Sequence, residues 1–142
     1  MTKGAESREQ GPGATTESFA YKYRRLTTDP AVALRGDAFG SELPNGYTTV
    51  SQAARLADLL GVGPGSALLD LGSGRGWPGG HIASVTGCAP VVADLPLDAL
   101  RTAGRVLSEL DPIRGHVVCA DGFRLPFRDR SFDAACHTDV LC

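Results

Sequence analysis

Residues 67–76 read Ala-Leu-Leu-Asp-Leu-Gly-Ser-Gly-Arg-Gly, and this stretch decides the fold of the chain. An apolar run enters it, and three glycines at alternate positions end it. This order is typical of a buried parallel strand that leads into a nucleotide-binding loop. Glycine suits such a loop because it tolerates positive φ and lets a ligand approach the backbone closely. A glycine triplet alone is a weak signal, and a glycine-rich turn without a ligand is the alternative at this point.

The apolar segments around this stretch alternate between helix and strand patterns. Residues 50–60 have helical spacing, and helices are also expected after Pro78 and Pro96. Strands are expected at residues 67–71, 91–94, 117–120 and 132–136. The order predicts an α/β fold, a Rossmann-like, open and partly parallel sheet with helices on both faces. Right-handed crossovers place the second and third strands on one side of the first.

The helix after the glycine loop has an unusual start. Pro78 suits a first helical turn, but Gly79 and Gly80 follow it. Each glycine costs about 1 kcal/mol relative to alanine in a helix interior. We therefore expect a close backbone approach at these glycines, with a late or frayed helix start as the alternative.

Length and composition predict one domain with two preceding segments. The chain has 142 residues. Residues 1–18 are polar and are expected to form a disordered tail. Residues 19–48 are expected to form an N-terminal cap segment and loop, and residues 49–142 the Rossmann-like domain.

Charge and cysteine spacing argue against several classes of partner. Fourteen basic and sixteen acidic side chains leave a formal charge of −2, which gives no electrostatic basis for binding nucleic acid or an anionic membrane. No apolar run approaches the ~20 residues of a membrane span, and the first residues lack the apolar stretch of a secretory signal. A cytoplasmic protein is expected. The cysteines lack zinc-site spacing, so no metal is expected; Cys119 and Cys136 are expected to be buried thiols.

Three carboxylates lie at or near the carboxyl ends of predicted strands, where ligands bind in an open parallel sheet. They are Asp70, Asp94 and Asp121. Asp94 lies 22 residues after Gly72, close to the ~20-residue offset of a ribose-binding acid. The alternatives are a helix-capping role for Asp94 and a plain Asp-Gly hairpin turn at Asp121 and Gly122.

The glycine spacing separates two ligand classes. The dinucleotide pattern places its third glycine five positions after the first, where this chain has Trp77. The third glycine comes one residue earlier, at Gly76. This spacing after Asp70 resembles the first motif of the class I S-adenosylmethionine-dependent methyltransferases, in particular their small-molecule, type 11-like group. An NAD-binding dehydrogenase fragment is the more distant alternative.

Two further motifs carry the resemblance. Val-Val-Ala-Asp-Leu stands at residues 91–95, and Ala-Asp-Gly at residues 120–122. The run Leu-Pro-Phe-Arg-Asp-Arg-Ser-Phe-Asp follows at residues 125–133. Together with the glycine loop they occur in the order of the family, over residues 47–140.

The resemblance implies an S-adenosylmethionine site and a role for each matching residue. Asp70 with Gly72, Gly74 and Gly76 would bracket the methionine portion of the cofactor. Asp94 would hold the ribose, and Leu95 would lie against the adenine. Asp121 and the backbone of Gly122 would face the adenine edge.

The resemblance also implies a reaction. His137 and Thr138 would lie near the reacting methyl group, and His137 has a side chain suited to a general base. The expected function is methyl transfer to a small-molecule acceptor that the sequence does not identify. Cys-His-Thr-Asp at residues 136–139 replaces the Asn/Asp-Pro-Pro-aromatic pattern of amino-group nucleic-acid methyltransferases.

The family fold has seven strands, and this sequence provides four. We therefore expect the cofactor-binding portion of a methyltransferase, truncated after its fourth strand. A non-catalytic remnant that binds the cofactor weakly or not at all is the second interpretation. The fourth strand would form an exposed edge, so self-association through that strand is expected.

Overall fold

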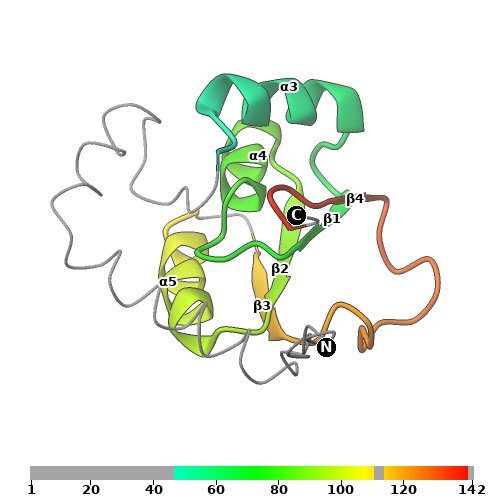
Figure 1. The fold of residues 1–142 in the computed structure, drawn as a ribbon. Helices are drawn as coiled ribbons and strands as arrows, with labels where there is room; N and C mark the ends of the chain where they lie inside the picture. Colours follow the sequence, from blue (N-terminus) through cyan, green and yellow to red (C-terminus); the bar gives the residue numbers. More distant parts are fainter. Residues whose placement is uncertain (1–46, 111–113, 141–142) are drawn as a thin grey trace, which may run out of the picture.

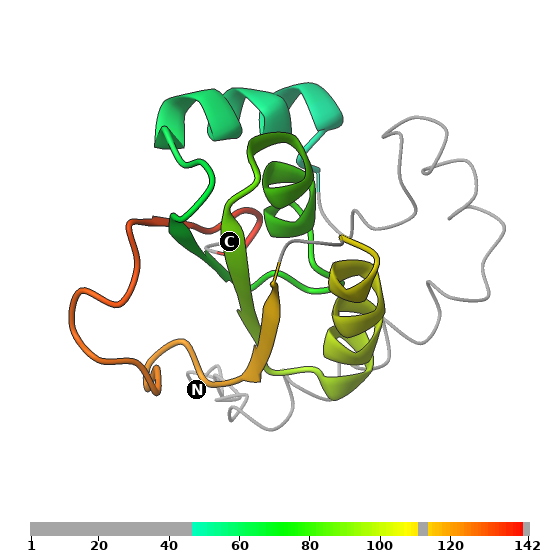
Figure 2. The same ribbon diagram turned by 180° about the vertical axis from the view of Figure 1, so that it is seen from behind.

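The computed structural model describes residues 47–110 and 114–140. The tail expected at residues 1–18 and most of the segment expected at 19–48 lie outside this part. The described elements are α3 (Val50–Leu60), β1 (Ala67–Leu71), α4 (Gly79–Thr86), β2 (Ala89–Asp94), α5 (Leu97–Ser108), β3 (His116–Cys119) and β4 (Ala134–Cys136). Figures 1 and 2 are views from two opposite sides, and both show the helices packed against the sheet.

The four strands form one parallel sheet in the order β3-β2-β1-β4. Asp70 of β1 is paired with Val92 of β2 on one side and with Cys136 of β4 on the other. The second and third strands therefore lie on one side of β1, as the right-handed crossover rule predicts. The Rossmann-like fold class predicted from the sequence is confirmed.

The helices of the described residues pack together on the sheet. Helix α4 contacts β1 and β2, α5 contacts β2 and β3, and α3 packs against α4. Helices α4 and α5 share one face because both crossovers run in the same direction along the sheet. Helices on the second face, which the fold class also predicts, are not among the described residues.

Helix α3 begins and ends where its sequence predicts. The Thr49 hydroxyl accepts a hydrogen bond from Gln52 N (3.3 Å), and the Gln52 side chain accepts one from Thr49 N (2.8 Å). This reciprocal capping box satisfies two backbone N–H groups at the helix start. Gly61 ends the helix in the left-handed conformation, with φ of 61°.

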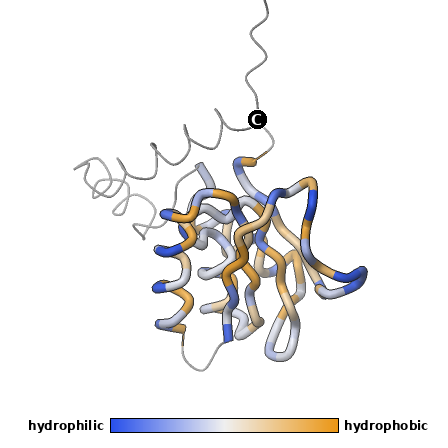
Figure 3. Tube along the Cα trace, turned by 90° about the horizontal axis from the view of Figure 1, so that it is seen from below, coloured by the Kyte–Doolittle hydropathy of each residue, from blue (hydrophilic) through white to orange (hydrophobic). Residues whose placement is uncertain are grey.

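The main core lies where α3 and α4 meet β1 and β4. Leu68, Ile82, Ala83 and Cys88 are fully buried there, and Ala57 and Cys136 complete the cluster. A second cluster joins Val92 to the inner face of α5. Figure 3 shows the apolar strands inside and the hydrophilic residues on the outer helix surfaces and loop tips. Cys119 is exposed, so its predicted burial is wrong; β3 is the outermost strand on its side of the described sheet.

Gly79 explains the unusual start of α4. Helix α4 begins at Gly79 directly after Pro78, so the late start is wrong. A Cβ added at Gly79 would lie 2.7 Å from both Cβ and Oδ2 of Asp70. The close backbone approach is therefore confirmed at Gly79, and the group that needs the space is the buried Asp70 carboxylate.

Candidate functional site

The glycine loop crosses the carboxyl ends of β1 and β2. Gly72 N and Ser73 N both donate to Ala93 O of β2, at 2.8 and 3.3 Å. Ala120 N donates to Asp94 O (3.0 Å), which brings the end of β3 to the same edge. The three strand ends that carry Asp70, Asp94 and Asp121 therefore meet, as the parallel sheet predicts.

Asp94 ties the end of β2 to the glycine loop. Its Oδ2 accepts a hydrogen bond from Gly74 N (2.7 Å), and its Oδ1 accepts one from Leu95 N (2.7 Å). Burial raises the pKa of the Asp94 carboxyl, and these two hydrogen bonds oppose the rise. Each carboxylate oxygen keeps a second lone pair, so Asp94 retains acceptor capacity for a ligand.

Asp70 lies beneath the loop and points into the protein. Its side chain is 1% exposed, and its Oδ2 accepts a hydrogen bond from Gly79 N (2.7 Å) at the start of α4. The Cys136 thiol donates to its Oδ1 at 3.7 Å. Burial raises the pKa of Asp70 to about 7; the bonds from Gly79 and Cys136 oppose the rise, and the Asp94 charge adds to it.

The Cys136 thiol is the neutral partner of this pair. Burial raises the pKa of Cys136, and the negative charge of Asp70 raises it further. A neutral thiol can donate to the carboxylate, whereas a thiolate would repel it. The structure therefore places Asp70 among protein groups, and its predicted role beside the methionine portion of the cofactor stays a prediction.

Leu95, Asp121 and Gly122 lie at the outer part of the edge. The Leu95 side chain is 42% exposed, so an apolar surface is available there. Asp121 Oδ1 accepts a hydrogen bond from Phe123 N (2.9 Å), which holds a turn. The hairpin alternative for Asp121 and Gly122 is wrong because β3 and β4 lie on opposite edges of the described sheet. The adenine roles of the three residues stay predictions.

The three loop glycines have positive φ: 72° at Gly72, 55° at Gly74 and 94° at Gly76. Gly76 also allows α5 to approach, since a Cβ there would lie 3.3 Å from Ala103 Cβ. At Gly72 a Cβ would overlap a methyl group of Val140. The segment after β4 thus packs directly onto the first glycine of the loop.

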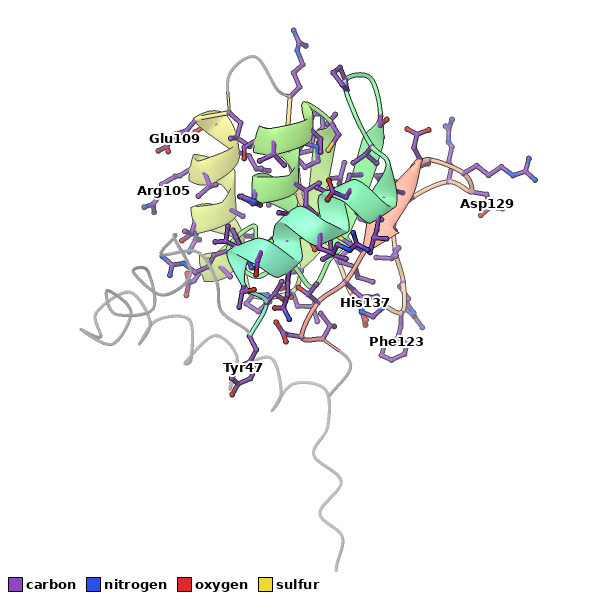
Figure 4. All side chains as sticks on the ribbon, turned by 90° about the horizontal axis from the view of Figure 1, so that it is seen from above. Tyr47, Arg105, Glu109, Phe123, Asp129 and His137 are labelled. Carbon is purple, nitrogen blue, oxygen red and sulfur yellow. The ribbon has the colours of Figure 1, made fainter. Side chains whose placement is uncertain are left out.

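His137 and Thr138 have different surroundings. Thr138 lines a pocket of about 370 Å³ between α3 and the segment after β4. His137 is exposed and is not part of the pocket wall. Figure 4 shows His137 after β4, and Tyr47 at the start of the described chain beside α3. The general-base role of His137 stays a prediction. The pocket is lined by Tyr47, Thr48, Gln52, Arg55, Leu56, Thr138 and Asp139.

Three residues that the sequence did not single out for a site connect this pocket to the glycine loop. The Asp139 carboxylate accepts hydrogen bonds from Tyr47 N (2.9 Å), Thr48 N (3.2 Å) and Thr48 Oγ1 (3.0 Å). On the other side, Trp77 Nε1 donates to Thr48 O (2.9 Å). No local pattern could have revealed these contacts, because Thr48 and Asp139 are separated by 91 residues.

The described residues contain neither a metal cluster nor a membrane-spanning helix. In residues 47–110 and 114–140, no cluster of histidine, cysteine, aspartate or glutamate has the arrangement of a metal site. No helix within these same ranges has the length and apolar character needed to cross a bilayer.

Known proteins match both the sequence and the fold. A family model described as a methyltransferase domain matches residues 69–142. The botryococcene C-methyltransferase of Botryococcus braunii is 34% identical over 119 residues, which cover 75% of this chain and 29% of that protein. The 24-methylenesterol C-methyltransferase 2 of Oryza sativa subsp. japonica is 37% identical over 91 residues, 62% of this chain and 24% of that protein. The chain thus spans less than a third of the length of these relatives.

A solved structure supports the fold. The S-adenosylmethionine-dependent methyltransferase of Geobacter sulfurreducens, in complex with S-adenosyl-L-homocysteine, superposes with a TM-score of 0.61 at 20% identity. The match covers 79% of this chain and 44% of that chain. Because the family model spans more than half of the sequence, the chain belongs to the class I S-adenosylmethionine-dependent methyltransferases, and the cofactor of this family is S-adenosylmethionine.

Proposed function

We propose that this chain binds S-adenosylmethionine where β1 and β2 end and takes part in methyl transfer to an apolar small molecule. The observation that carries the proposal is the position of Asp94, a carboxylate at the end of β2 that also holds the glycine loop through Gly74 N. A carboxylate can accept hydrogen bonds from both hydroxyls of a ribose. It would repel the phosphate of an NADP-type ligand.

The other groups of the edge fit the same cofactor. Leu95 offers an exposed apolar side chain next to Asp94, suited to the face of an adenine ring. Ser73, within the glycine loop, has a buried hydroxyl without a hydrogen-bond partner among the described residues. A buried polar group of this kind is costly unless a ligand or water satisfies it. These features support a ligand at the loop.

In methyl transfer the main role of the protein is to orient the cofactor and the acceptor. The bound cofactor supplies a methyl group on a positively charged sulfonium, which leaves as a neutral thioether. The residues of this chain would hold the ribose at Asp94, keep the loop in place and bring the acceptor into line. His137 remains the proposed base where the acceptor must lose a proton.

The acceptor is proposed to lie in the pocket beside α3. Tyr47 and Leu56 give this pocket apolar walls, and Thr138 lies two residues after β4, in the segment whose Val140 packs on Gly72. The two relatives named above are carbon methyltransferases of a sterol and of botryococcene, by their names. We therefore propose an isoprenoid hydrocarbon or sterol as the acceptor class.

Calorimetric titration tests cofactor binding directly. The chain should bind S-adenosylhomocysteine more tightly than NAD. Asp94→Ala should weaken binding by about 1.5–3 kcal/mol, roughly ten- to a hundredfold, since charge-assisted hydrogen bonds are lost. Asp98→Ala is the matched control, because Asp98 pairs with Arg101 on α5 (2.8 Å). Equal affinity of the Asp94 and Asp98 variants would contradict the ribose role, and tighter binding of NAD would favour the dehydrogenase alternative.

A radiolabelled methyl assay tests the acceptor class. Squalene and a sterol are offered with the chain alone and with the chain extended by any downstream coding sequence. Transfer to either acceptor supports the proposal. Cofactor binding without transfer by either form would favour the non-catalytic interpretation.

Two expectations from the sequence belong to this proposal. Strand β4 lies at the edge of the described sheet, so self-association through its free side is proposed. Light scattering measures it, and a monomer at all concentrations would contradict it. A cytoplasmic location is the other expectation, and fractionation of the source cells would test it.

A further inference from the structure

Thr48 joins three segments that are far apart in the sequence. Its backbone N and its hydroxyl donate to Asp139 after β4, and its carbonyl oxygen accepts from the indole of Trp77 in the glycine loop. The residue is 8% exposed. We call Thr48, Trp77 and Asp139 the clasp.

The backbone of Asp139 is left-handed where its carboxylate accepts the hydrogen bonds of the clasp. Its φ is 57°, a left-handed conformation that residues other than glycine rarely adopt. Such a conformation persists where surrounding contacts hold it in place, and it concentrates at functional sites. Three hydrogen bonds from Tyr47 and Thr48 to the Asp139 carboxylate provide this hold.

The clasp lies between the two parts of the proposed site. Thr48 and Asp139 form part of the pocket wall, whereas Trp77 is buried and directly follows Gly76 of the loop. Val140, the neighbour of Asp139, packs on Gly72 at the start of the loop. The glycine loop is thus held near Gly72 by Val140 and next to its other end, at Trp77, by Thr48, which bonds to Asp139.

We propose that Asp139 and Thr48 are positioning residues for cofactor binding, acting through Trp77 and Val140 on the glycine loop. The inference rests on the proposed function, which places S-adenosylmethionine at this loop. A loop held in its binding conformation before the ligand arrives loses less freedom on binding. Loss of the clasp should therefore weaken cofactor binding.

The test compares two substitutions at Thr48 with one at Asp139 and a control at Thr102. Thr48→Val removes the hydroxyl but keeps the shape and the carbonyl that accepts from Trp77, and Thr48→Ser keeps the hydroxyl. Asp139→Ala removes the common acceptor. Thr102→Val is the matched control, because the Thr102 hydroxyl donates to Asp98 O within α5 and takes no part in the clasp. S-adenosylhomocysteine is the probe, and its affinity is measured by calorimetry well below the melting temperature of each variant.

We expect Thr48→Val and Asp139→Ala to bind S-adenosylhomocysteine about fivefold more weakly, the equivalent of about 1 kcal/mol. Thr48→Ser and Thr102→Val should stay within twofold of the original chain. The double variant Thr48→Val, Asp139→Ala should be less impaired than the product of the single effects, because both remove the same bond. Unchanged affinity in Thr48→Val, or equal loss in Thr48→Ser, would overturn the proposal.

A ligand-free measurement separates this inference from the proposed function. Trp77 is the single tryptophan of the chain, so the fluorescence emission reports on the surroundings of this one side chain. Acrylamide should quench it more strongly in Asp139→Ala than in Thr102→Val. Equal quenching would refute the clasp itself. If the original chain binds no S-adenosylhomocysteine, the proposed function and the positioning role both fail, and the quenching result still decides whether the clasp holds Trp77.

Discussion

Replacement of Asp70 by asparagine should stabilise the protein at neutral and alkaline pH. The Asp70 carboxyl is 1% exposed and receives hydrogen bonds only from Gly79 N and the Cys136 thiol among the described residues. Burial of the charged form outweighs these bonds, which is why the pKa of Asp70 rises to about 7. Asparagine has nearly the same shape and keeps an oxygen for Gly79 N, but it carries no charge to bury.

The sign and size of the effect follow from the pKa shift. The pKa rises from 3.8 to about 7, so the folded protein holds this proton more tightly than the unfolded chain. The stabilising contribution is fully present below pH ~4 and is lost as the pH rises through ~7. At 1.36 kcal/mol for each pH unit, the loss approaches about 4 kcal/mol by pH 8.

Urea unfolding at a series of pH values measures this difference. Asp70→Asn and the original chain should have similar free energies of unfolding near pH 4, where both side chains are neutral. The variant should become progressively more stable than the original between pH 4 and 8. Asp94, whose pKa is also raised, is present in both proteins, so the comparison retains only its electrostatic interaction with Asp70.

Two results would refute this reasoning. A stability difference independent of pH would mean that Asp70 does not titrate in this range in the folded protein. A variant that is less stable than the original at pH 8 would mean that the charged carboxylate is favoured by its surroundings. Cys136→Ala in the same series should raise the Asp70 pKa further, because it removes the donor thiol.

Two smaller predictions concern the helix starts. Gly79→Ala should destabilise the protein by more than 1 kcal/mol, because the new Cβ would lie 2.7 Å from Asp70. Gly63→Ala is the control and should change stability little, because its Cβ would meet only Thr86 O, at 3.9 Å. Urea unfolding compares the two variants, and equal effects would count against the Asp70 contact. Thr49→Ala should cost about 1 kcal/mol through loss of the capping box of α3, measured in the same way, and Ser51→Ala should cost clearly less.

The local pattern of residues was sufficient to predict the order of the helices and strands along the chain. The apolar run 67–71 and the glycines after it predict β1 with its boundaries, since strand and turn preferences act within a few residues. The end of β2 at Asp94 follows for the same reason. Strand β4 is shorter than predicted, Ala134–Cys136 instead of 132–136, because its length depends on pairing with β1 as well as on its own sequence.

The different surroundings of the three carboxylates could be found only from the tertiary structure. The sequence placed Asp70, Asp94 and Asp121 alike at strand ends, but it could not tell which would be buried. Packing of α4 against β1 encloses Asp70 beneath Gly79, whereas Asp121 stays exposed in a turn. Burial is a property of the assembled elements, and the pKa of Asp70 follows from that burial.

The sequence by itself determined the alternation of strands and helices, the glycine loop and the family, because these depend on residues close together in the chain. Only the tertiary structure decided that Asp139 holds Thr48, that Trp77 bonds to the same residue and that Val140 covers Gly72. Thr48 and Asp139 are separated by 91 residues, and no periodicity extends over that distance. Their contact arises because parallel pairing of β4 with β1 brings the segment after β4 to the edge of the sheet that carries the glycine loop.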